Sequence, residues 1–299
     1  MKIFDLHCDT FCELFDRGLD FDNIETAVNI KELSQFETVI QTFAVFLHPN
    51  ISDSFKRYIN VMNYGKRCLE KMGIEVCRDS ESLDGAGVKA LLSVEGGVPE
   101  FDLNNIEMLY SDGVRTVSLT WNYDNPLGGG ALGDGCLTEL GRQTVDELNR
   151  FNMVTDLSHL NRKSFLEVAE RSELIVATHS GVDKLHFHPR NLTDEQLNII
   201  KNKSGLVGLS VYPEFIGKNP FEGFYRAIMH CLDLGLEDCL SLGTDFDGAT
   251  MHESLSKISD LKLLYCFLVE NGIENQICDK IFFENSKEFY DRVLTNSKI

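Results

Sequence analysis

The sequence predicts an α/β protein folded as a closed (β/α)8 barrel of the TIM type, with residues 1–299 in a single domain. Eight short apolar segments alternate with segments of helical periodicity, which is the pattern of repeated βα units. No change in composition along the chain marks a linker. Polar residues follow the apolar segments where strands would end, and in a barrel these ends encircle one mouth. An open doubly wound sheet, the alternative, would usually place its first and last strands far apart.

The predicted strands are short runs rich in β-branched and aromatic residues. Residues 38–47, TVIQTFAVFL, show this most clearly, because the run is apolar almost throughout, as expected of a parallel strand with both faces covered. The predicted strands, in chain order, are 3–7, 38–47, 89–94, 114–120, 153–157, 174–178, 205–211 and 239–244.

Helical patterns fill the intervals between these strands. Phe55, Ile59 and Met62 recur at helical spacing. Thr193 and Gln196 have the spacing of a capping box, in which each residue satisfies a backbone N–H of the other. Helices are predicted at 11–17, 54–72, 104–111, 138–151, 161–171, 193–200 and 221–234, with two more toward the C-terminus.

The composition is that of a globular protein with a strongly acidic surface. The net charge of −19 opposes association with nucleic acids or anionic membranes, so neither is expected as a partner. The nine cysteines show no spacing typical of a disulfide framework and indicate reduced thiols. No apolar run approaches membrane-spanning length, and the first residues have the pattern of a strand rather than of a signal peptide. We therefore expect a cytoplasmic protein.

Histidines and carboxylates stand at the ends of several predicted strands. His7 and Asp9 are two residues apart, so in an extended segment their side chains point the same way. Glu95, His159 and His179 follow three other predicted strands. Imidazole and carboxylate ligands suit zinc and similar divalent metals. Five ligands exceed the needs of one catalytic zinc, but two metals that share a bridging carboxylate would use them all.

The chain resembles the membrane (renal) dipeptidase family, peptidase family M19 of the amidohydrolase superfamily. The resemblance runs from residue 5 to residue 248, in the order of the family's motifs, and covers the whole predicted barrel. The matching segments are Asp5-Leu6-His7-Cys8-Asp9-Thr10, Val94-Glu95-Gly96-Gly97, Asp156-Leu157-Ser158-His159, Thr178-His179-Ser180, His188-Pro189-Arg190-Asn191 and Gly243-Thr244-Asp245-Phe246-Asp247-Gly248.

This resemblance implies a dipeptidase that hydrolyses the peptide bond of small dipeptides through a bridging hydroxide. It implies two zinc ions per chain, one held by His7 and Asp9, the other by His159 and His179, with Glu95 bridging them. A homodimer is also what the family suggests.

The resemblance further assigns residues to proton transfer and substrate binding. Asp245 is implied as the general base, which takes a proton from the bridging water and passes it to the leaving amine. Arg190 matches the arginine that binds the α-carboxylate of the substrate, and a guanidinium suits that anion because it donates two parallel hydrogen bonds. Tyr212, at the end of the seventh predicted strand, aligns with a tyrosine of the binding pocket.

One position departs from the family pattern. Animal members carry a histidine in the Leu-Thr-His stretch after the fourth strand, where it contacts the substrate near the scissile carbonyl. Trp121 stands at the matching position here, and Asn122 and Tyr123 are the neighbouring candidates for the missing contact. The departure concerns the substrate range rather than the metal ligands.

Two other classes of function are alternatives. Another amidohydrolase reaction would act on a lactone or on a cyclic or acylated amide, but binuclear relatives of that kind commonly bridge their metals with a modified lysine after the fourth strand. No lysine lies between Lys89 and Lys163. A metal-binding protein without catalysis is the second alternative, and the presence of Asp245 beside five ligands disfavours it.

Overall fold

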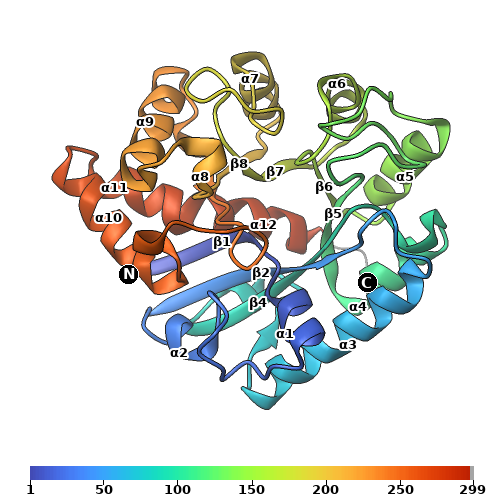
Figure 1. Ribbon diagram of the computed structural model, residues 1–299, viewed down its shortest axis with the longest axis horizontal. Helices are drawn as coiled ribbons and strands as arrows, with labels where there is room; N and C mark the ends of the chain where they lie inside the picture. Colours follow the sequence, from blue (N-terminus) through green and yellow to red (C-terminus); the bar gives the residue numbers. More distant parts are fainter. Residues whose placement is uncertain (297–299) are drawn as a thin grey trace.

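The computed structural model describes residues 1–296, and these residues form a closed parallel barrel surrounded by helices (Figure 1). The strands of the barrel pair in the order β2-β1-β9-β8-β7-β6-β5-β4, and β4 pairs with β2 to close the ring. The (β/α)8 fold is therefore confirmed, and the open sheet is excluded. The barrel strands are β1 (Lys2–Cys8), β2 (Thr38–Phe46), β4 (Gly87–Glu95), β5 (Val114–Ser118), β6 (Val154–Asp156), β7 (Ile175–Ser180), β8 (Leu206–Leu209) and β9 (Leu240–Leu242).

A further strand, β3 (Glu75–Val76), lies outside this ring. It pairs with Lys89 and Ala90 at the start of β4, ahead of the point at which β5 joins the same strand at Leu92. Sequence periodicity does not predict it, because two residues are too few to show a pattern.

The helices alternate with the strands and cover the outside of the barrel (Figure 1). The capping box predicted at Thr193 and Gln196 is present, with both of its hydrogen bonds. After β9 the described residues contain three α-helices, one more than the sequence predicts. The α-helices are α1 (Thr10–Arg17), α2 (Ile30–Leu33), α3 (Ser54–Lys71), α4 (Asn105–Asp112), α5 (Glu139–Arg150), α6 (Arg162–Arg171), α7 (Asp194–Asn202), α8 (Pro213–Ile216), α9 (Pro220–Asp233), α10 (Leu261–Glu270), α11 (Asn275–Asp279) and α12 (Asn285–Thr295).

Short 3-10 turns and one π-helical segment complete the secondary structure. The π-helical segment, η6, joins α11 to α12 and packs against β1 and β9. These elements are η1 (Glu81–Leu83), η2 (Pro99–Phe101), η3 (Glu237–Cys239), η4 (Glu253–Leu255), η5 (Ile258–Asp260) and η6 (Lys280–Glu284).

Helix α12 closes the end of the barrel at which the strands begin. Its Phe289 and Tyr290 are buried with residues near the start of several strands, and the ring of Tyr290 stacks on Phe4 with the centroids 5.4 Å apart. Tyr290 also makes a 2.7 Å hydrogen bond with the hydroxyl of Thr116. A packed plug at this end leaves the opposite end, where the strands finish, as the accessible mouth.

No helix within residues 1–296 is both long enough and apolar enough to cross a membrane.

Candidate metal centre

The five predicted metal ligands meet at the mouth of the barrel. Each follows or ends a different barrel strand, except that His7 and Asp9 both belong to the end of β1. The four histidine and glutamate side chains are buried, and Asp9 is largely buried. Barrel closure brings these residues together although up to 172 positions separate them in the chain (179 − 7).

His7 lies between two carboxylates. Its Nε2 is 3.2 Å from Oδ2 of Asp9 and 3.1 Å from Oε2 of Glu95. Gly248 allows this arrangement, because a Cβ at that position would collide with Oδ2 of Asp9. The other oxygen of Asp9, Oδ1, is buried without a hydrogen-bond partner, which is costly for a carboxylate unless a cation compensates it.

A second group of donors lies on the other side of Glu95. Oε1 of Glu95 is 2.8 Å from Nε2 of His159, and Nε2 of His159 is 2.8 Å from Nε2 of His179. The two oxygens of one carboxylate therefore face different histidines, Oε1 toward His159 and Oε2 toward His7. This is the arrangement that a bridging carboxylate requires.

Neighbouring polar groups hold His159 and His179 by their Nδ1 atoms. We call these two the distal histidines, because they lie on the other side of Glu95 from His7. The Thr178 hydroxyl donates to Oδ2 of Asp156 at 2.6 Å, which leaves its oxygen to accept the Nδ1–H of His179 at 2.9 Å. Oδ1 of Asn122 lies 2.8 Å from Nδ1 of His159 and accepts its hydrogen in the same way. Both histidines then direct an unprotonated Nε2 into the site, which is the form that binds metal.

Strained backbone supports this geometry. His159 and Asp245 both have positive φ, at 69° and 64°, although neither is glycine. Such conformations cost about 1–3 kcal/mol each and persist where the surrounding structure determines them. Asn161, which caps α6 by accepting from the backbone N–H of Ser164, fixes the turn that carries His159.

The electrostatics of the site favour neutral distal histidines and an ionised glutamate. Burial, with the charge of Arg190, lowers the pKa of His159 to about 4. Burial, followed by the charges of His7 and Arg190, holds the pKa of His179 well below its usual value. Burial opposes the charge on Glu95, but the contacts of its two oxygens with His159 and with His7 hold its pKa well below the usual range.

His7 differs from the other two histidines. Burial lowers its pKa, but the hydrogen bonds and charges of Asp9 and Glu95 outweigh burial and hold the pKa well above the usual value. In the metal-free protein a proton thus occupies the place between these carboxylates, where a metal cation would relieve the same excess of negative charge.

The donor set fits divalent metal ions. Within the described residues, His7, Glu95 and His179 place candidate ligand atoms within 4.8 Å of one another, and so do His7, Asp9 and Asp245. Nitrogen and carboxylate donors together suit zinc, and the buried Asp9 oxygen without a hydrogen-bond partner is a donor that a cation would satisfy.

Asp245 lies at the edge of this cluster, beyond the end of β9. Its Oδ1 is 3.9 Å from Nε2 of His7. Burial raises the pKa of Asp245 to about 8, with the charges of Asp9 and Glu95 adding to the shift. A carboxyl group that changes protonation near neutral pH is suited to general acid and base catalysis.

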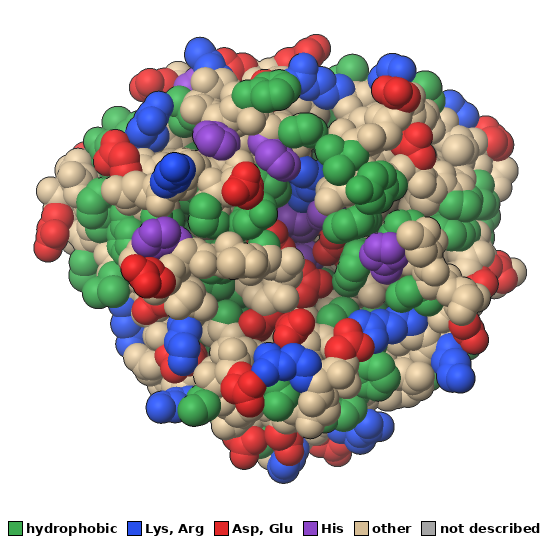
Figure 2. Space-filling model, in the orientation of Figure 1, with side chains coloured by type: hydrophobic (Ala, Val, Ile, Leu, Met, Phe, Trp, Pro, Cys, Tyr) green, Lys and Arg blue, Asp and Glu red, His purple; other side chains and the backbone are tan. Residues whose placement is uncertain are grey.

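A cleft of about 580 Å³ opens over the cluster, large enough for a small ligand. Figure 2 shows histidine, acidic and basic side chains gathered in a hollow at the centre of this face. Arg190, Tyr212 and Asn122, the three predicted substrate-binding residues, all line the cleft. Arg190 is buried, its guanidinium lies 5.4 Å from the ring centroid of Phe215, and its Nη2 donates to the carbonyl of His179 at 3.3 Å.

The structure also shows residues to which the sequence assigns no role. Asp247 lines the cleft and ties the segment before α2 to the barrel, because it accepts from the Thr10 hydroxyl at 2.6 Å and from the backbone N–H of Ala27 at 2.7 Å. The signal in the sequence is its place in the segment Gly243-Thr244-Asp245-Phe246-Asp247-Gly248, which matches the family motif. Asn122 is predicted to bind substrate, and the structure adds its contact with His159. No periodicity reveals such a partner.

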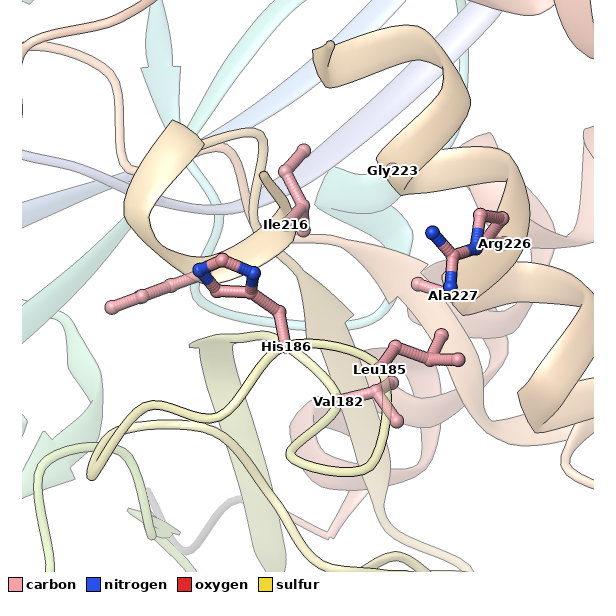
Figure 3. A pocket seen from close by; sticks show the side chains of 8 residues that line it. Val182, Leu185, His186, Ile216, Gly223, Arg226 and Ala227 are labelled. Carbon is pink, nitrogen blue, oxygen red and sulfur yellow. The ribbon is translucent and has the colours of Figure 1, made fainter. Parts of the chain in front are cut away.

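A second cavity lies near helices α8 and α9 (Figure 3). Its volume is about 10 Å³, so it has room for about one water molecule and no substrate. The labelled residues around it are Val182, Leu185, His186, Ile216, Gly223, Arg226 and Ala227.

Comparison with known proteins identifies the family. The model of the membrane dipeptidases, peptidase family M19, matches residues 1–296. The chain belongs to this family. It is accordingly a hydrolase of the metallo-dipeptidase type. The family resemblance of the sequence motifs is confirmed.

Two relatives illustrate how far the similarity of this M19 protein extends. An uncharacterized protein from the pqqA 5′ region of Klebsiella pneumoniae is 31% identical over 247 residues, which cover 77% of this chain and 88% of the relative. An uncharacterized dipeptidase of Schizosaccharomyces pombe is 26% identical over 296 residues, covering 86% of this chain and 70% of the relative.

The fold is shared with a solved metallopeptidase structure. A metallopeptidase from Rhodobacter sphaeroides, solved with a phosphinate mimic of the dipeptide L-Ala-D-Ala, superposes with a TM-score of 0.86 at 23% identity and covers 98% of this chain and 99% of its own. At that identity the match establishes the barrel fold of this M19 chain.

Proposed function

We propose that this protein hydrolyses dipeptides with two zinc ions held at the mouth of the barrel. His7 and Asp9 would hold one ion, His159 and His179 the other, and Glu95 would bridge them. The observation that carries the proposal is the orientation of Glu95, whose Oε2 lies 3.1 Å from Nε2 of His7 and whose Oε1 lies 2.8 Å from Nε2 of His159.

Bound zinc would supply a Lewis acid for the scissile carbonyl and would make water more acidic. The chain itself supplies the remaining functions. Arg190 is buried beside His179, so a carboxylate bound to it would lie next to the ligand cluster in a site with little competing water. A planar guanidinium recognises a carboxylate through two parallel hydrogen bonds. This contact selects a substrate whose free α-carboxylate is one residue away from the bond that breaks.

Asp245 is the residue to which the proposal assigns proton transfer. Peptide hydrolysis forms a bond between water oxygen and the carbonyl carbon and breaks the carbon–nitrogen bond, and the nitrogen must be protonated to leave. Asp245 would take a proton from the attacking water and deliver it to that nitrogen, which returns the carboxylate to its starting state. Its position 3.9 Å from Nε2 of His7 places it beside the ligands.

The test is a combined metal and activity measurement. Metal-free protein is reconstituted with zinc, its metal content is measured by elemental analysis, and it is assayed with a dipeptide, the C-terminally amidated dipeptide and an N-acetylated amino acid. The proposal requires two zinc ions per chain and hydrolysis of the free dipeptide. Zinc binding without turnover of any dipeptide would indicate a metal-binding protein without catalysis. Preferred turnover of the acylated amino acid would indicate a different amidohydrolase reaction.

A further inference from the structure

One wall of the cleft is aromatic. Phe46, the last residue of β2, and Trp121, which follows β5, both line the cleft, and their ring centroids are 5.4 Å apart. His48 and Tyr123 extend the cluster, with centroids 5.5 and 5.6 Å from that of Trp121. Phe46 and Trp121 line the cleft, His48 and Tyr123 pack against Trp121, and we refer to these four residues as the aromatic wall.

Phe46 and Arg190 belong to opposite sides of the barrel. The wall lies at the ends of β2 and β5, which flank β4. Arg190 follows β7, and Tyr212 follows β8. In the closed order of eight strands, β7 is the fourth strand from β2 in either direction and the second strand from β5. The metal ligands lie around the mouth between these two sides.

The aromatic wall also reaches the metal centre. The ring centroid of Trp121 is 6.3 Å from that of His159. A dipeptide whose carboxylate binds Arg190 and whose peptide carbonyl lies at the ligand cluster must therefore extend its N-terminal residue toward Trp121 and Phe46. This step rests on the proposed function.

The charged groups near the wall already have partners. Arg57 lines this part of the cleft and is paired with both carboxylate oxygens of Asp16, one of them at 2.7 Å. Glu13 lies 3.3 Å from the guanidinium of Arg17. A charged side chain of the substrate would meet groups that are already paired, whereas an apolar side chain needs no charged partner.

Further apolar surface borders the aromatic wall. Leu132 lines the cleft and is 52% exposed. Trp121 itself is only partly buried, so ring surface remains available for contact. Aromatic rings prefer tilted or offset contacts with other rings, as Phe46 and Trp121 show with a tilt of 52°, so a substrate ring can add a contact of the same kind on the exposed part of Trp121.

We propose that the aromatic wall is the binding site for the side chain of the substrate's N-terminal residue and that it selects large apolar residues, above all aromatic ones. The contact is made in addition to the carboxylate contact at Arg190. Burial of a phenyl or isobutyl group here should raise kcat/KM by about 10- to 100-fold over a substrate that begins with glycine.

The experiment uses the zinc-loaded full-length protein and five dipeptides that end in alanine and begin with glycine, leucine, phenylalanine, aspartate or lysine. We expect the phenylalanine and leucine substrates to exceed the glycine substrate by roughly 10- to 100-fold in kcat/KM, and the aspartate and lysine substrates not to exceed it. Trp121→Ala should reduce kcat/KM for the phenylalanine substrate by about tenfold or more relative to that for the glycine substrate. Trp121→Phe should keep the preference, because it retains a ring.

Matched measurements separate this inference from the function on which it rests. Phe187→Ala removes an aromatic side chain that is 80% exposed and outside the cleft lining, and it should leave the substrate preference unchanged. Zinc content and melting temperature of each variant report whether the centre and the fold are intact. Binding of phosphinate analogues that begin with glycine or phenylalanine gives the same comparison without turnover.

The outcomes are distinct. Hydrolysis of all five dipeptides within about threefold of one another would overturn the aromatic wall as a selective site and leave the dipeptidase function standing. Equal loss for the glycine and phenylalanine substrates in Trp121→Ala, with zinc retained, would assign Trp121 to the peptide unit instead. Absence of hydrolysis for every substrate would overturn both proposals.

Discussion

Nε2 of His159 and Nε2 of His179 lie 2.8 Å apart at the mouth of the barrel, and both rings are buried. The Nδ1 hydrogens of the two rings are taken by Asn122 and Thr178, so in the neutral rings each Nε2 carries a lone pair. Two lone pairs at hydrogen-bond distance repel one another unless a proton or a cation lies at the site. The low pKa values of both histidines disfavour the proton. The protein thus presents two neutral imidazole ligands prepared for a metal.

The proposed bridging role of Glu95 predicts the zinc content of a Glu95 variant. Glu95→Gln should lower the zinc content from two ions per chain to one or fewer, because the neutral amide cannot serve both ligand groups. Elemental analysis after reconstitution and gel filtration measures the change. Glu13→Gln is the matched control, since the carboxylate of Glu13 belongs to the same cleft but pairs with Arg17, and it should retain both ions. Two tightly bound ions in Glu95→Gln would contradict the bridge.

The hydrogen bonds behind His179 make a second prediction. Thr178→Val keeps the shape of the side chain but removes the hydroxyl between Asp156 and Nδ1 of His179. Loss of such an orienting group typically lowers metal affinity by about 10- to 100-fold. Competition with a chelator of known affinity measures this for each ion, and one ion should be affected more than the other.

Two further variants control for general damage to the barrel. Thr155→Val removes a buried hydroxyl from the neighbouring strand that contacts Ser172 at 2.8 Å and no predicted ligand. Thr155→Val should leave zinc affinity unchanged. Thr178→Ser keeps a hydroxyl at position 178 and should therefore retain most of the zinc affinity that Thr178→Val loses. An equal effect of Thr155→Val and Thr178→Val would mean that the loss reflects packing rather than histidine orientation.

Substrate recognition is tested at Arg190. Arg190→Lys should reduce kcat/KM for a free dipeptide by on the order of 100-fold, because an ammonium group cannot form the two parallel hydrogen bonds. The zinc content should stay at two per chain. An amidated dipeptide should be a poor substrate for the unmodified protein. Its kcat/KM should fall little further in Arg190→Lys. Equal turnover of the acid and the amide by the unmodified protein would reject Arg190 as the carboxylate site.

Substitution of Asp245 distinguishes a role in proton transfer from a role in metal binding. Asp245→Asn is nearly isosteric but cannot accept the proton, so turnover should fall by about 10²- to 10⁴-fold while both zinc ions and dipeptide binding remain. Elemental analysis, inhibitor binding and steady-state kinetics give the three quantities. Parallel loss of metal and activity would make Asp245 a ligand, and near-complete activity would require another proton route.

Metal binding should release protons near neutral pH. Asp9 and Glu95 outweigh burial and hold the pKa of His7 well above its usual value, so the metal-free protein carries a proton there that a ligand to zinc must lose. Apparent zinc affinity should therefore rise with pH throughout the neutral range and level off only above the pKa of His7. Calorimetry in buffers of different ionisation enthalpy should detect at least one proton released per chain at pH 7. A pH-independent affinity would contradict this assignment.

Local patterns in the sequence were sufficient for the elements of the barrel. The apolar runs mark the eight strands, and the hydrogen bonds of Thr193 and Gln196 are the capping box that their spacing predicts. The spacing of His7 and Asp9 likewise predicts that their side chains point the same way, because alternate residues of an extended strand share a face. These features depend on neighbours a few residues away, which is why a single chain read in order reveals them.

Only the tertiary structure decided how the ligands are oriented. The approach of Glu95 to His7 and His159 depends on closure of the ring through the pairing of β2 with β4, which no local pattern encodes. The contacts of Asn122 and Thr178 with Nδ1 atoms fix which nitrogen of each histidine is free, and they arise from side chains on neighbouring strands and loops. The sequence supplies donors of the right chemistry, but their distances and tautomers follow from packing between strands distant in the chain.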